Sequence, residues 1–503
     1  MNTSYIRTPE SISIKNIEEK GFTLSSSQYV DLVMPNKNYK LVRDFLSRPL
    51  KRSDLGVEVG SLNYICQSPF YFLRTKALQP YSFLPEITSE SALPVMPSVF
   101  VKQNLKEGDL LISKDSNIGE VVILEKDYHN FMTSSAIYKL PVNKYKYYLL
   151  AFIKHQIFRE QLDFMVPKGA TIRHAKTMFL DCKIPIPNKN SAETMKFVEV
   201  LTQAIINKEK IIQQRIEDTF NKIEKELIEN QKSSEFKLEF PTILELEKVG
   251  RLDTGMYSEH YKKNKHLIGN YKNGYCSFLQ LNNGKVDISR GQNLQESNIG
   301  KSIYSDSFIK DFYKLCLSKK FTPHQTLTDY LYIGTPKSLK KIQKGELIFS
   351  CRGDMGRSIV FVEDVTNTIT NIDNVHISFK DQELFKTIFI GQFLNWLKYK
   401  NYISKIAISG SGADSFTIYQ FDLLDIPSFS IEKQMEIAKL YHNPAIDYQT
   451  KNCTLDNFLE FDSKHNQNAG IYELDKTAKQ LKAKLNFAID NIVNDKPVKI
   501  DFV

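Results

Sequence analysis

The chain has 503 residues, of which 42% are hydrophobic and 25% charged, and its formal net charge is +9. These values predict a soluble globular protein of two to four domains. They argue against a membrane protein, since no run of 18 or more apolar residues occurs and the polar start does not resemble a signal peptide. The six cysteines are scattered singly, which argues against a zinc knuckle or disulfide framework and favours a reducing cytoplasm.

The positive charge is unevenly distributed along the chain. Residues 1–190 and 231–430 carry the excess of Lys and Arg, whereas 191–230 and 431–503 are slightly acidic. Nucleic acid is one reason to concentrate positive charge in this way. Chance variation in a mildly basic protein is the alternative.

The first basic block contains the stretch KEGDLLISKDSNIGEVVIL at 106–124. Its hydrophobic runs predict strands over 109–113 and 120–124, joined by a polar turn. A helix is expected over 145–161. The segment PKGATIRHAKTMFLDCKIPIP at 167–187 then gives a Gly-Ala loop and a strand-like run that ends in Ile-Pro.

A long helix follows the first block. Apolar residues recur every three or four positions from Val198 to Leu227, and no Pro or Gly occurs between Ser191 and Phe240. This pattern predicts one amphipathic helix of about 35–40 residues, roughly 55–60 Å long.

The second basic block repeats the features of the first. The stretch KGELIFSCRGDMGRSIVFV at 344–362 predicts strands over 346–350 and 358–362, and a helix is expected over 383–400. The segment SGSGADSFTIYQFDLLDIPSF at 409–429 is again a Gly-Ala loop with a strand-like run ending in Ile-Pro.

The C-terminal region is predicted to be helical with an interruption. A short helix over 431–441 ends at Asn443-Pro444, and a polar connector follows. Seven apolar residues then alternate in steps of three and four, as in a heptad seam: Ile471, Leu474, Ala478, Leu481, Leu485, Ala488 and Ile492. We expect this helix to pack antiparallel with the central one; the alternative is that each helix covers its own block.

The two blocks predict an internal duplication. When 106–124 is aligned with 343–361 without a gap, four residues coincide: Gly108/Gly345, Leu110/Leu347, Ser113/Ser350 and Gly119/Gly356. TLSSSQY at 23–29 also resembles RLDTGMY at 251–257, and Ile184-Pro185 corresponds to Ile426-Pro427. The order of these matches is conserved along the chain, which predicts two copies of one unit, each a basic block followed by a helical region.

No catalytic motif stands out in the sequence. NIGKS at 298–302 has Gly-Lys-Ser, but Gln295 stands where a phosphate-binding loop needs its first glycine. G-x-G-x-x-G, G-x-S-x-G and H-E-x-x-H are absent, and the nine histidines are dispersed. QSPFYF at 67–72 does not match the Asn/Asp-Pro-Pro-Tyr/Phe motif of adenine methyltransferases.

Taken together, the two GDLLIS-type strands, the Gly-Ala loops leading to Ile-Pro and the long helices resemble one family. The order of features is similar to that of the specificity subunit of type I restriction–modification systems, and RLDTGMYSEHYKKN resembles the start of a target recognition domain. The resemblance covers nearly the whole chain, although its C-terminal helical region is interrupted where the family's is usually more continuous.

The resemblance implies a fold of the α/β (α+β) class with four segments. Target recognition domains are expected at 1–190 and 236–429. A central helix at 191–235 and a C-terminal helical region at 430–503 are expected to act as spacer and docking surface, their long amphipathic helices forming an antiparallel pair.

It also implies a non-catalytic subunit of a cytoplasmic phage-defence complex. Each target recognition domain would read half of a split site in double-stranded DNA, and the helices would set the spacer. Two modification subunits would methylate adenine with S-adenosylmethionine, and restriction subunits would use ATP and Mg. No cofactor or metal is expected in this chain, and no membrane partner.

Polar residues of the turns and Gly-Ala loops are the candidates for DNA contact, since Arg can read guanine, Asn adenine, and Lys meets phosphate. In the first block they are Lys114, Ser116, Asn117, Lys168, Thr171, Arg173 and His174. In the second block they are Arg352, Asp354, Arg357, Ser411 and Ser415. A protein-interaction scaffold with duplicated domains and no sequence-specific DNA binding is the alternative function, and an isolated nuclease is a third.

Overall fold

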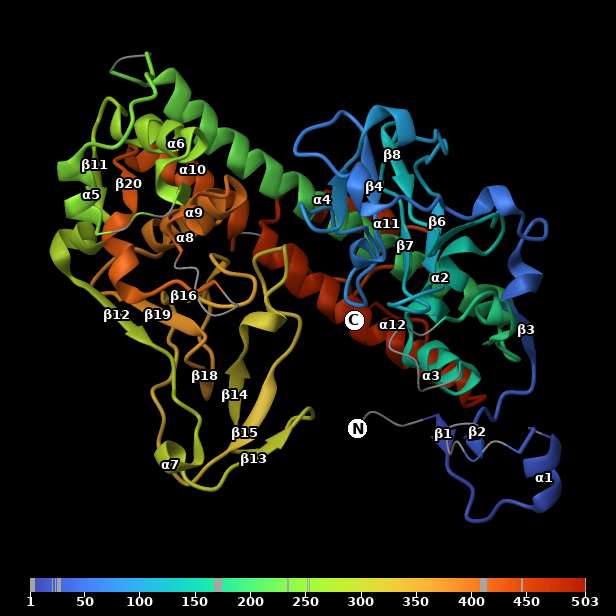
Figure 1. Ribbon diagram of the computed structural model, residues 1–503. Coiled ribbons are helices and arrows are strands. Elements are labelled where there is room, and N and C mark those ends of the chain that lie inside the picture. The colour runs from blue at the N-terminus through green and yellow to red at the C-terminus, as the bar shows by residue number, and fades with distance from the viewer. Residues whose placement is uncertain are drawn as a thin grey trace. The chain divides into compact units, whose positions relative to one another are not determined.

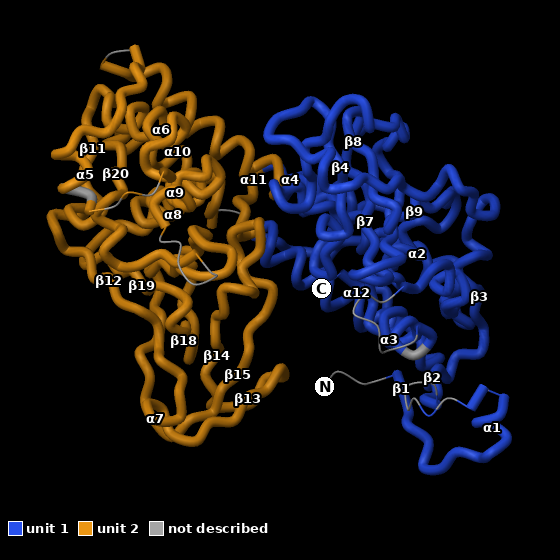
Figure 2. The backbone as a smooth tube through the Cα atoms, viewed as in Figure 1, with its two compact units in different colours: residues 1–211, 447–467, 474–503 blue, residues 212–446, 468–473 orange. Residues whose placement is uncertain are grey.

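The computed structural model describes residues 5–19, 21–22, 24, 29–166, 174–232, 235–250, 252, 254–407, 414–444 and 447–502 (Figure 1). The chain forms two compact units (Figure 2). Unit 1 comprises residues 1–211, 447–467 and 474–503, and unit 2 comprises residues 212–446 and 468–473. Within the described ranges, no helix is both long and apolar enough to cross a membrane.

Unit 1 combines short strands with helices. Its strands are β1 (Ile6–Arg7), β2 (Asp31–Leu32), β3 (Tyr39–Leu41), β4 (Tyr71–Leu73), β5 (Ala92–Pro94), β6 (Leu110–Ser113), β7 (Val121–Ile123), β8 (Phe131–Thr133), β9 (Ile137–Leu140) and β10 (Lys183–Pro185). Its helices are α1 (Ile14–Glu19), α2 (Lys146–Lys154), α3 (Gln156–Met165), the first part of α4 (Ser191–Glu229), most of α11 (Phe458–Asn468) and most of α12 (Ile471–Val493).

The strand β6 is the buried middle strand of a three-stranded sheet in unit 1, which explains its unbroken apolar sequence. It pairs antiparallel with β7 and with β9. Leu110 and Ile112 pack into the core formed with α2, α4 and α12, whereas Leu111 packs into a second apolar cluster on the other face. Because alternate side chains of a strand point to opposite faces, both faces of β6 must be apolar.

Unit 2 has the same mixture of elements. Its strands are β11 (Tyr275–Ser277), β12 (Val286–Arg290), β13 (Ile303–Ser305), β14 (Tyr313–Cys316), β15 (Leu331–Gly334), β16 (Leu347–Ser350), β17 (Ser358–Val360), β18 (Thr368–Thr370), β19 (Asn374–Phe379) and β20 (Asp425–Pro427). Its helices are α5 (Ile243–Val249), α6 (Glu259–Gly269), α7 (Glu296–Ile299), α8 (Leu384–Tyr399), α9 (Tyr402–Ile406), α10 (Ile431–Tyr441) and the second part of α4.

Apart from the β1–β2 pair, the described sheets of unit 1 each have a counterpart in unit 2. The order β7-β6-β9 in unit 1 matches β17-β16-β19 in unit 2, to which β12 adds an edge strand. The order β5-β4-β8 matches β15-β14-β18, to which β13 adds an edge strand, and β4–β8 and β14–β18 are both parallel pairs. The pair β3–β10 matches β11–β20, which contain the two Ile-Pro sequences. These correspondences support the predicted duplication.

The long helix α4 packs against α12 within unit 1. Leu201 and Ile205 of α4 share a core with Leu485 and Ile489 of α12. Glu209 forms an ion pair with Lys482 at the middle of α12, whereas the ring of Phe197, earlier in α4, lies 5.3 Å from that of Phe502 beyond the end of α12. The contacts run in opposite order, so the two helices are antiparallel. The prediction of a mixed fold with paired long helices is therefore confirmed.

A buried polar cluster joins α4 to α11. Lys208 is fully buried, and its Nζ lies 2.8 Å from Asp462 Oδ1 and donates to Asn466 Oδ1 at 2.7 Å. The Tyr448 hydroxyl also donates to Asp462 Oδ1 at 2.7 Å, so the buried carboxylate has several donors. Burial lowers the pKa of the Lys208 ammonium, and Asp462 opposes that effect.

Three local predictions differ from the structure. The strand-like runs expected before the two Ile-Pro sequences contain 3-10 helices over Met178–Asp181 and Ile418–Leu423, and only the three-residue strands β10 and β20 follow them. The helix expected over 145–161 is two helices, because His155 leaves the helical conformation and its ring Nδ1 accepts from the Ile157 amide at 3.3 Å, starting α3. The connector expected after 444 contains α11, whose few apolar residues gave only a weak helical pattern. The helices expected over 383–400, 431–441 and 471–492 are present as α8, α10 and α12.

Candidate nucleic-acid interface

The hairpin of β6 and β7 in unit 1 is built on two glycines, Gly108 before β6 at its open end and Gly119 in the turn between the strands. Gly108 and Gly119 have φ values of +82° and +78°, which favour glycine. The Gly108 amide donates to Leu124 O at 2.8 Å, and the Gly119 amide donates to Ser113 O at 2.8 Å. A Cβ on Gly119 would lie 2.4 Å from Leu162 Cδ1, so the turn also packs closely on α3.

The hairpin of β16 and β17 in unit 2 has the same construction, with Gly345 before β16 and Gly356 in the turn. Gly345 and Gly356 have φ values of +86° and +88°. The Gly345 amide donates to Phe361 O at 2.7 Å, and the Gly356 amide donates to Ser350 O at 2.8 Å. A Cβ on Gly356 would lie 3.0 Å from Ile403, a residue of α9.

The shared serine makes the same kind of hydrogen bond in both copies, and so does the acidic residue after the first shared glycine. The Ser113 hydroxyl donates to Asp115 O at 2.6 Å, and the Ser350 hydroxyl donates to Arg352 O at 3.0 Å. Asp109 accepts from the Lys106 amide at 2.8 Å, and Glu346 accepts from the Gln343 amide at 2.6 Å. The motif is therefore repeated because it specifies a frame, while the residues at the tip of the turn remain free to differ.

The segment after each Gly-Ala loop lies beside this turn. The Ala175 amide donates to Lys114 O at 2.8 Å in unit 1, and the Phe416 amide donates to Cys351 O at 3.0 Å in unit 2. Two regions that were singled out separately in the sequence thus come together in both copies. Each copy presents one composite polar surface, which we call the turn surface: residues 114–118 with 174 in unit 1, and 351–355 with 415 in unit 2.

The structure distinguishes the candidates of unit 1. Lys114 is partly buried and paired with Asp115, whose other oxygen lies 2.7 Å from Nδ1 of the exposed His174. Ser116 and Asn117 are exposed at the tip, and Ser116 has a φ of +61°. The remaining candidates lie outside the described residues: Lys168, Thr171 and Arg173.

The candidates of unit 2 also have different environments. Arg352 is exposed and lies 3.5 Å from Asp373. Asp354 is paired with Arg357 and with Lys398. Arg357 was predicted to contact DNA, but its side chain is only 9% exposed, because it is packed in the turn and donates to Phe321 O at 3.4 Å. Ser415 is partly buried, and Ser411 lies outside the described residues.

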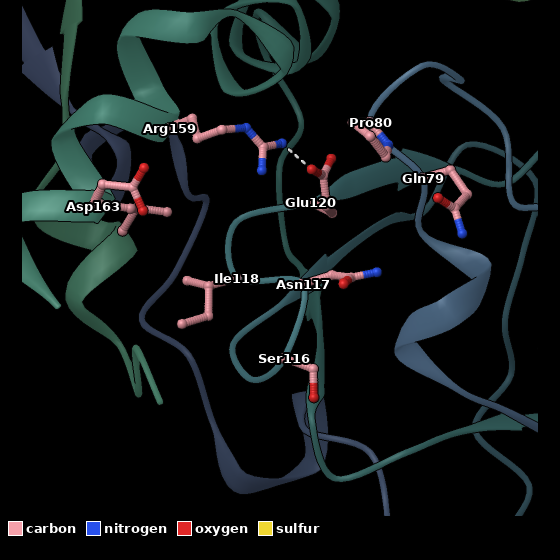
Figure 3. Close-up of a pocket in the computed structure, with 9 residues that line it drawn as sticks. Gln79, Pro80, Ser116, Asn117, Ile118, Glu120, Arg159 and Asp163 are labelled. Carbon is pink, nitrogen blue, oxygen red and sulfur yellow. Dashed lines mark hydrogen bonds and ion pairs between the residues drawn. The ribbon is translucent and has the colours of Figure 1, made fainter. Parts of the chain in front are cut away.

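A cavity of about 370 Å³ opens next to the turn surface of unit 1 (Figure 3). It is lined by Gln79, Pro80, Ser116, Asn117, Ile118, Glu120, Arg159, Leu162 and Asp163. Glu120 is nearly buried and forms an ion pair with Arg159, whose side chain is 47% exposed. Neither Glu120 nor Arg159 was among the residues that the sequence analysis selected. The one feature that could have pointed to Glu120 is its charge at the start of an otherwise apolar predicted strand.

A buried lysine lies behind Glu120. The Lys154 Nζ lies 3.7 Å from Glu120 and donates to Gln79 O at 2.7 Å. Burial lowers the pKa of the Lys154 ammonium to about 7, and the charge of Glu209 opposes this shift. In the part of the chain that the structure describes, no group of three or more His, Cys, Asp or Glu side chains could hold a metal ion.

Comparison with known families identifies part of the chain. Residues 99–237, which include β6, β7 and all of α4, match the model of the type I restriction modification DNA specificity domain. The chain therefore contains a type I specificity domain. This confirms the resemblance predicted from the sequence.

Solved structures from type I restriction–modification systems are distantly similar to the chain. The S subunit of a type I restriction–modification system from M. genitalium is 11% identical, with a TM-score of 0.38 over 93% of this chain and 96% of that one. The HsdS subunit from Thermoanaerobacter tengcongensis is 12% identical, with a TM-score of 0.26 over 91% and 97%. A chain studied for complex assembly and conformational transition of the type I R-M system is 13% identical, with a TM-score of 0.27 over 91% and 98%. No curated protein matches the sequence.

Proposed function

We propose that the chain is the DNA-recognition subunit of a type I restriction–modification complex and that each unit reads one half of a bipartite site. The matched specificity domain accounts for only part of the chain, and the duplication extends its role to unit 2. A pseudo-two-fold protein suits duplex DNA, whose backbone is itself pseudo-two-fold. Different turn residues in the two copies would let the half-sites differ in sequence.

The observation that carries this proposal is the turn surface, which is built twice on the same glycines, serine and backbone bonds but has different residues at its tip. The four residues that coincide in the two hairpins belong to this frame, whereas the tip residues all differ. This arrangement suits a DNA-reading protein, in which a fixed frame positions the protein on phosphates while a few side chains read base edges.

We assign base or phosphate contact to the exposed residues of the turn surfaces. In unit 1 these are Ser116, Asn117 and His174, joined by Lys168, Thr171 and Arg173 on the sequence argument. In unit 2 they are Arg352 and Asp354, joined by Ser411 and Ser415. Lys114 and Arg357 support the turns through their ion pairs.

The helices α4 and α12 have a separate role in this proposal. They pair through a shared apolar core and the Glu209–Lys482 ion pair, and the sequence 191–230 is slightly acidic, so we assign no DNA contact to them. We assign them to setting the number of base pairs between the half-sites and to docking two modification subunits, which supply S-adenosylmethionine-dependent adenine methylation. Restriction subunits, with ATP and Mg, would add cleavage, and a cytoplasmic location follows from this assembly.

The test is a methylome measurement. The chain is co-expressed with the modification subunit from its own genome in a host without other adenine methyltransferases. We expect methylated adenine in one bipartite motif, and exchange of residues 236–429 for those of another specificity subunit should change one half of it only. The scaffold alternative predicts no motif, and an isolated nuclease would cleave DNA without partners.

A further inference from the structure

The position directly after the second shared glycine holds a buried charge in both copies, but the charges are opposite. It is Glu120 after Gly119 in unit 1 and Arg357 after Gly356 in unit 2. Their backbone roles are the same, since the carbonyl oxygens of Glu120 and Arg357 accept from the amides of Ser113 and Ser350. The side chains are 4% and 9% exposed. A buried charge is costly unless it is paired, so each side chain needs an opposite charge beside the turn.

In unit 1 the partner of the buried charge is a cation. Glu120 pairs with Arg159 of α3, and this guanidinium lines the cavity together with Ser116 and Asn117 of the turn (Figure 3). Arg159 presents five N–H donors in a planar fork, and the carboxylate occupies only part of it. Ser116 and Asn117 of the turn line the same cavity as Arg159, and so does Asp163, whose negative charge also acts on the guanidinium. Holding the fork in place before binding reduces the entropy lost when it contacts a ligand.

In unit 2 the partner of the buried charge is an anion. Arg357 pairs with Asp354 at the tip of the turn, and Lys398 of α8 pairs with the other oxygen of the same carboxylate. The Asp354 side chain remains 41% exposed between these two cations. Its carboxylate can accept hydrogen bonds but has none to donate.

We infer that the residue after the second shared glycine is a positioning residue that sets which kind of base edge each copy reads. Glu120 holds Arg159 as a donor pair for the acceptor edge of a guanine in the first half-site. Arg357 holds Asp354 as an acceptor for the amino group of a cytosine in the second half-site. These are the base edges that each side chain matches in the major groove. The inference rests on the proposed function and adds Arg159, Glu120 and the two base classes to it.

The experiment compares the methylomes of variants of the full chain, co-expressed with the modification subunit. Arg159→Ala and Arg159→Lys should both relax one guanine in one half-site, lowering discrimination at that base pair about 5- to 150-fold. Lys is included because it keeps the charge but loses the planar fork. Glu120→Gln, which keeps the size of the side chain, should relax the same base pair to a smaller extent. Asp354→Asn should alter one base pair in the other half-site only.

A matched control separates reading from a general effect of removing an arginine. Arg43 is 52% exposed and paired with Asp181 in unit 1, but it does not line the cavity, so Arg43→Ala should leave the motif unchanged. The inference is overturned if both Arg159 variants retain the wild-type motif, or if relaxation falls on a base other than guanine or in both half-sites. It is equally overturned if Asp354→Asn leaves the motif intact. Failure of the proposed function is a different result, namely that the wild-type complex methylates no bipartite motif.

Discussion

The two shared glycines of the β16–β17 hairpin in unit 2 provide a sharp test of how this hairpin is stabilised. Gly345 and Gly356 have nearly the same φ, +86° and +88°, but different surroundings. A Cβ added to Gly345 meets nothing within 4 Å, whereas a Cβ on Gly356 meets three atoms of Ile403 at 3.0–3.2 Å. Gly345→Ala therefore introduces backbone strain alone, and Gly356→Ala introduces the same strain and a steric clash.

The expected magnitudes follow from these two contributions. A non-glycine residue in the left-handed region costs about 1–2 kcal/mol. Overpacking a core contact adds about 1–3 kcal/mol, and the smaller end applies here because Ile403 has to move only slightly. We expect Gly345→Ala to lower the free energy of unfolding by about 1–2 kcal/mol and Gly356→Ala to lower it by about 2–4 kcal/mol.

The chain supplies its own reporter for this measurement. Its single tryptophan, Trp396, is fully buried in α8 of unit 2, the unit that contains both glycines. Urea unfolding followed by Trp396 fluorescence gives the free energy of unfolding of this unit for each variant. Equal costs for the two substitutions, or a cost below about 0.5 kcal/mol for Gly356→Ala, would refute the reasoning.

Three further predictions concern unit 1 and can be checked by calorimetry of the full chain. Lys208→Met should lower the free energy of unfolding of unit 1 by about 3–5 kcal/mol, because it leaves Asp462 buried without its cation. The double variant Lys208→Met/Asp462→Leu should lower it by less, since no charge is then left unpaired. A larger loss of stability in the double variant would contradict this. Leu485→Ala in α12 should lower the free energy of unfolding by about 2–5 kcal/mol, because Leu485 is buried. Phe487→Ala on the same helix should change it by no more than about 0.5 kcal/mol, because that side chain is 65% exposed. Similar changes for the two variants would contradict the described contact between α4 and α12. The pKa of Lys154 is lowered to about 7, so the folded state binds fewer protons than the unfolded state between pH 7 and the ordinary pKa of lysine. The free energy of unfolding should therefore rise with pH over that range, and Lys154→Met should remove the rise. An unchanged pH profile in the variant would contradict this.

Much of the local structure could be predicted from the sequence because periodicity and capping are local. The 39-residue helix α4, the helix α10 and the buried seam of α12 follow from apolar spacing and from residues such as Ser430, whose hydroxyl accepts from the Lys433 amide. The strand–turn–strand stretches were visible for the same reason, since their glycines and apolar runs are contiguous. The break at His155 was not visible, because it depends on one side chain bonding to the backbone.

The candidate site was only partly accessible from the sequence. The turn tips and the segments after the Gly-Ala loops were found separately, but nothing in the sequence brings 174 to 115 or 416 to 351. Arg357 illustrates the same limit, since a polar residue in a turn was expected to be exposed and is instead buried by its packing. Arg159 could not be chosen among the charged residues of a helix until its contact with Glu120 was known.

The sequence by itself determined that the chain is a duplicated unit with long helices and a specificity-type motif in each copy, because these properties are carried by short contiguous patterns. Only the tertiary structure decided that residues 447–467 and most of α12 fold with the N-terminal block, and that a buried charge of opposite sign supports each turn. Both depend on contacts between residues that are distant in the chain. Such contacts are selected by the free energy of packing apolar surface and of pairing buried charge, and a linear sequence does not display that selection.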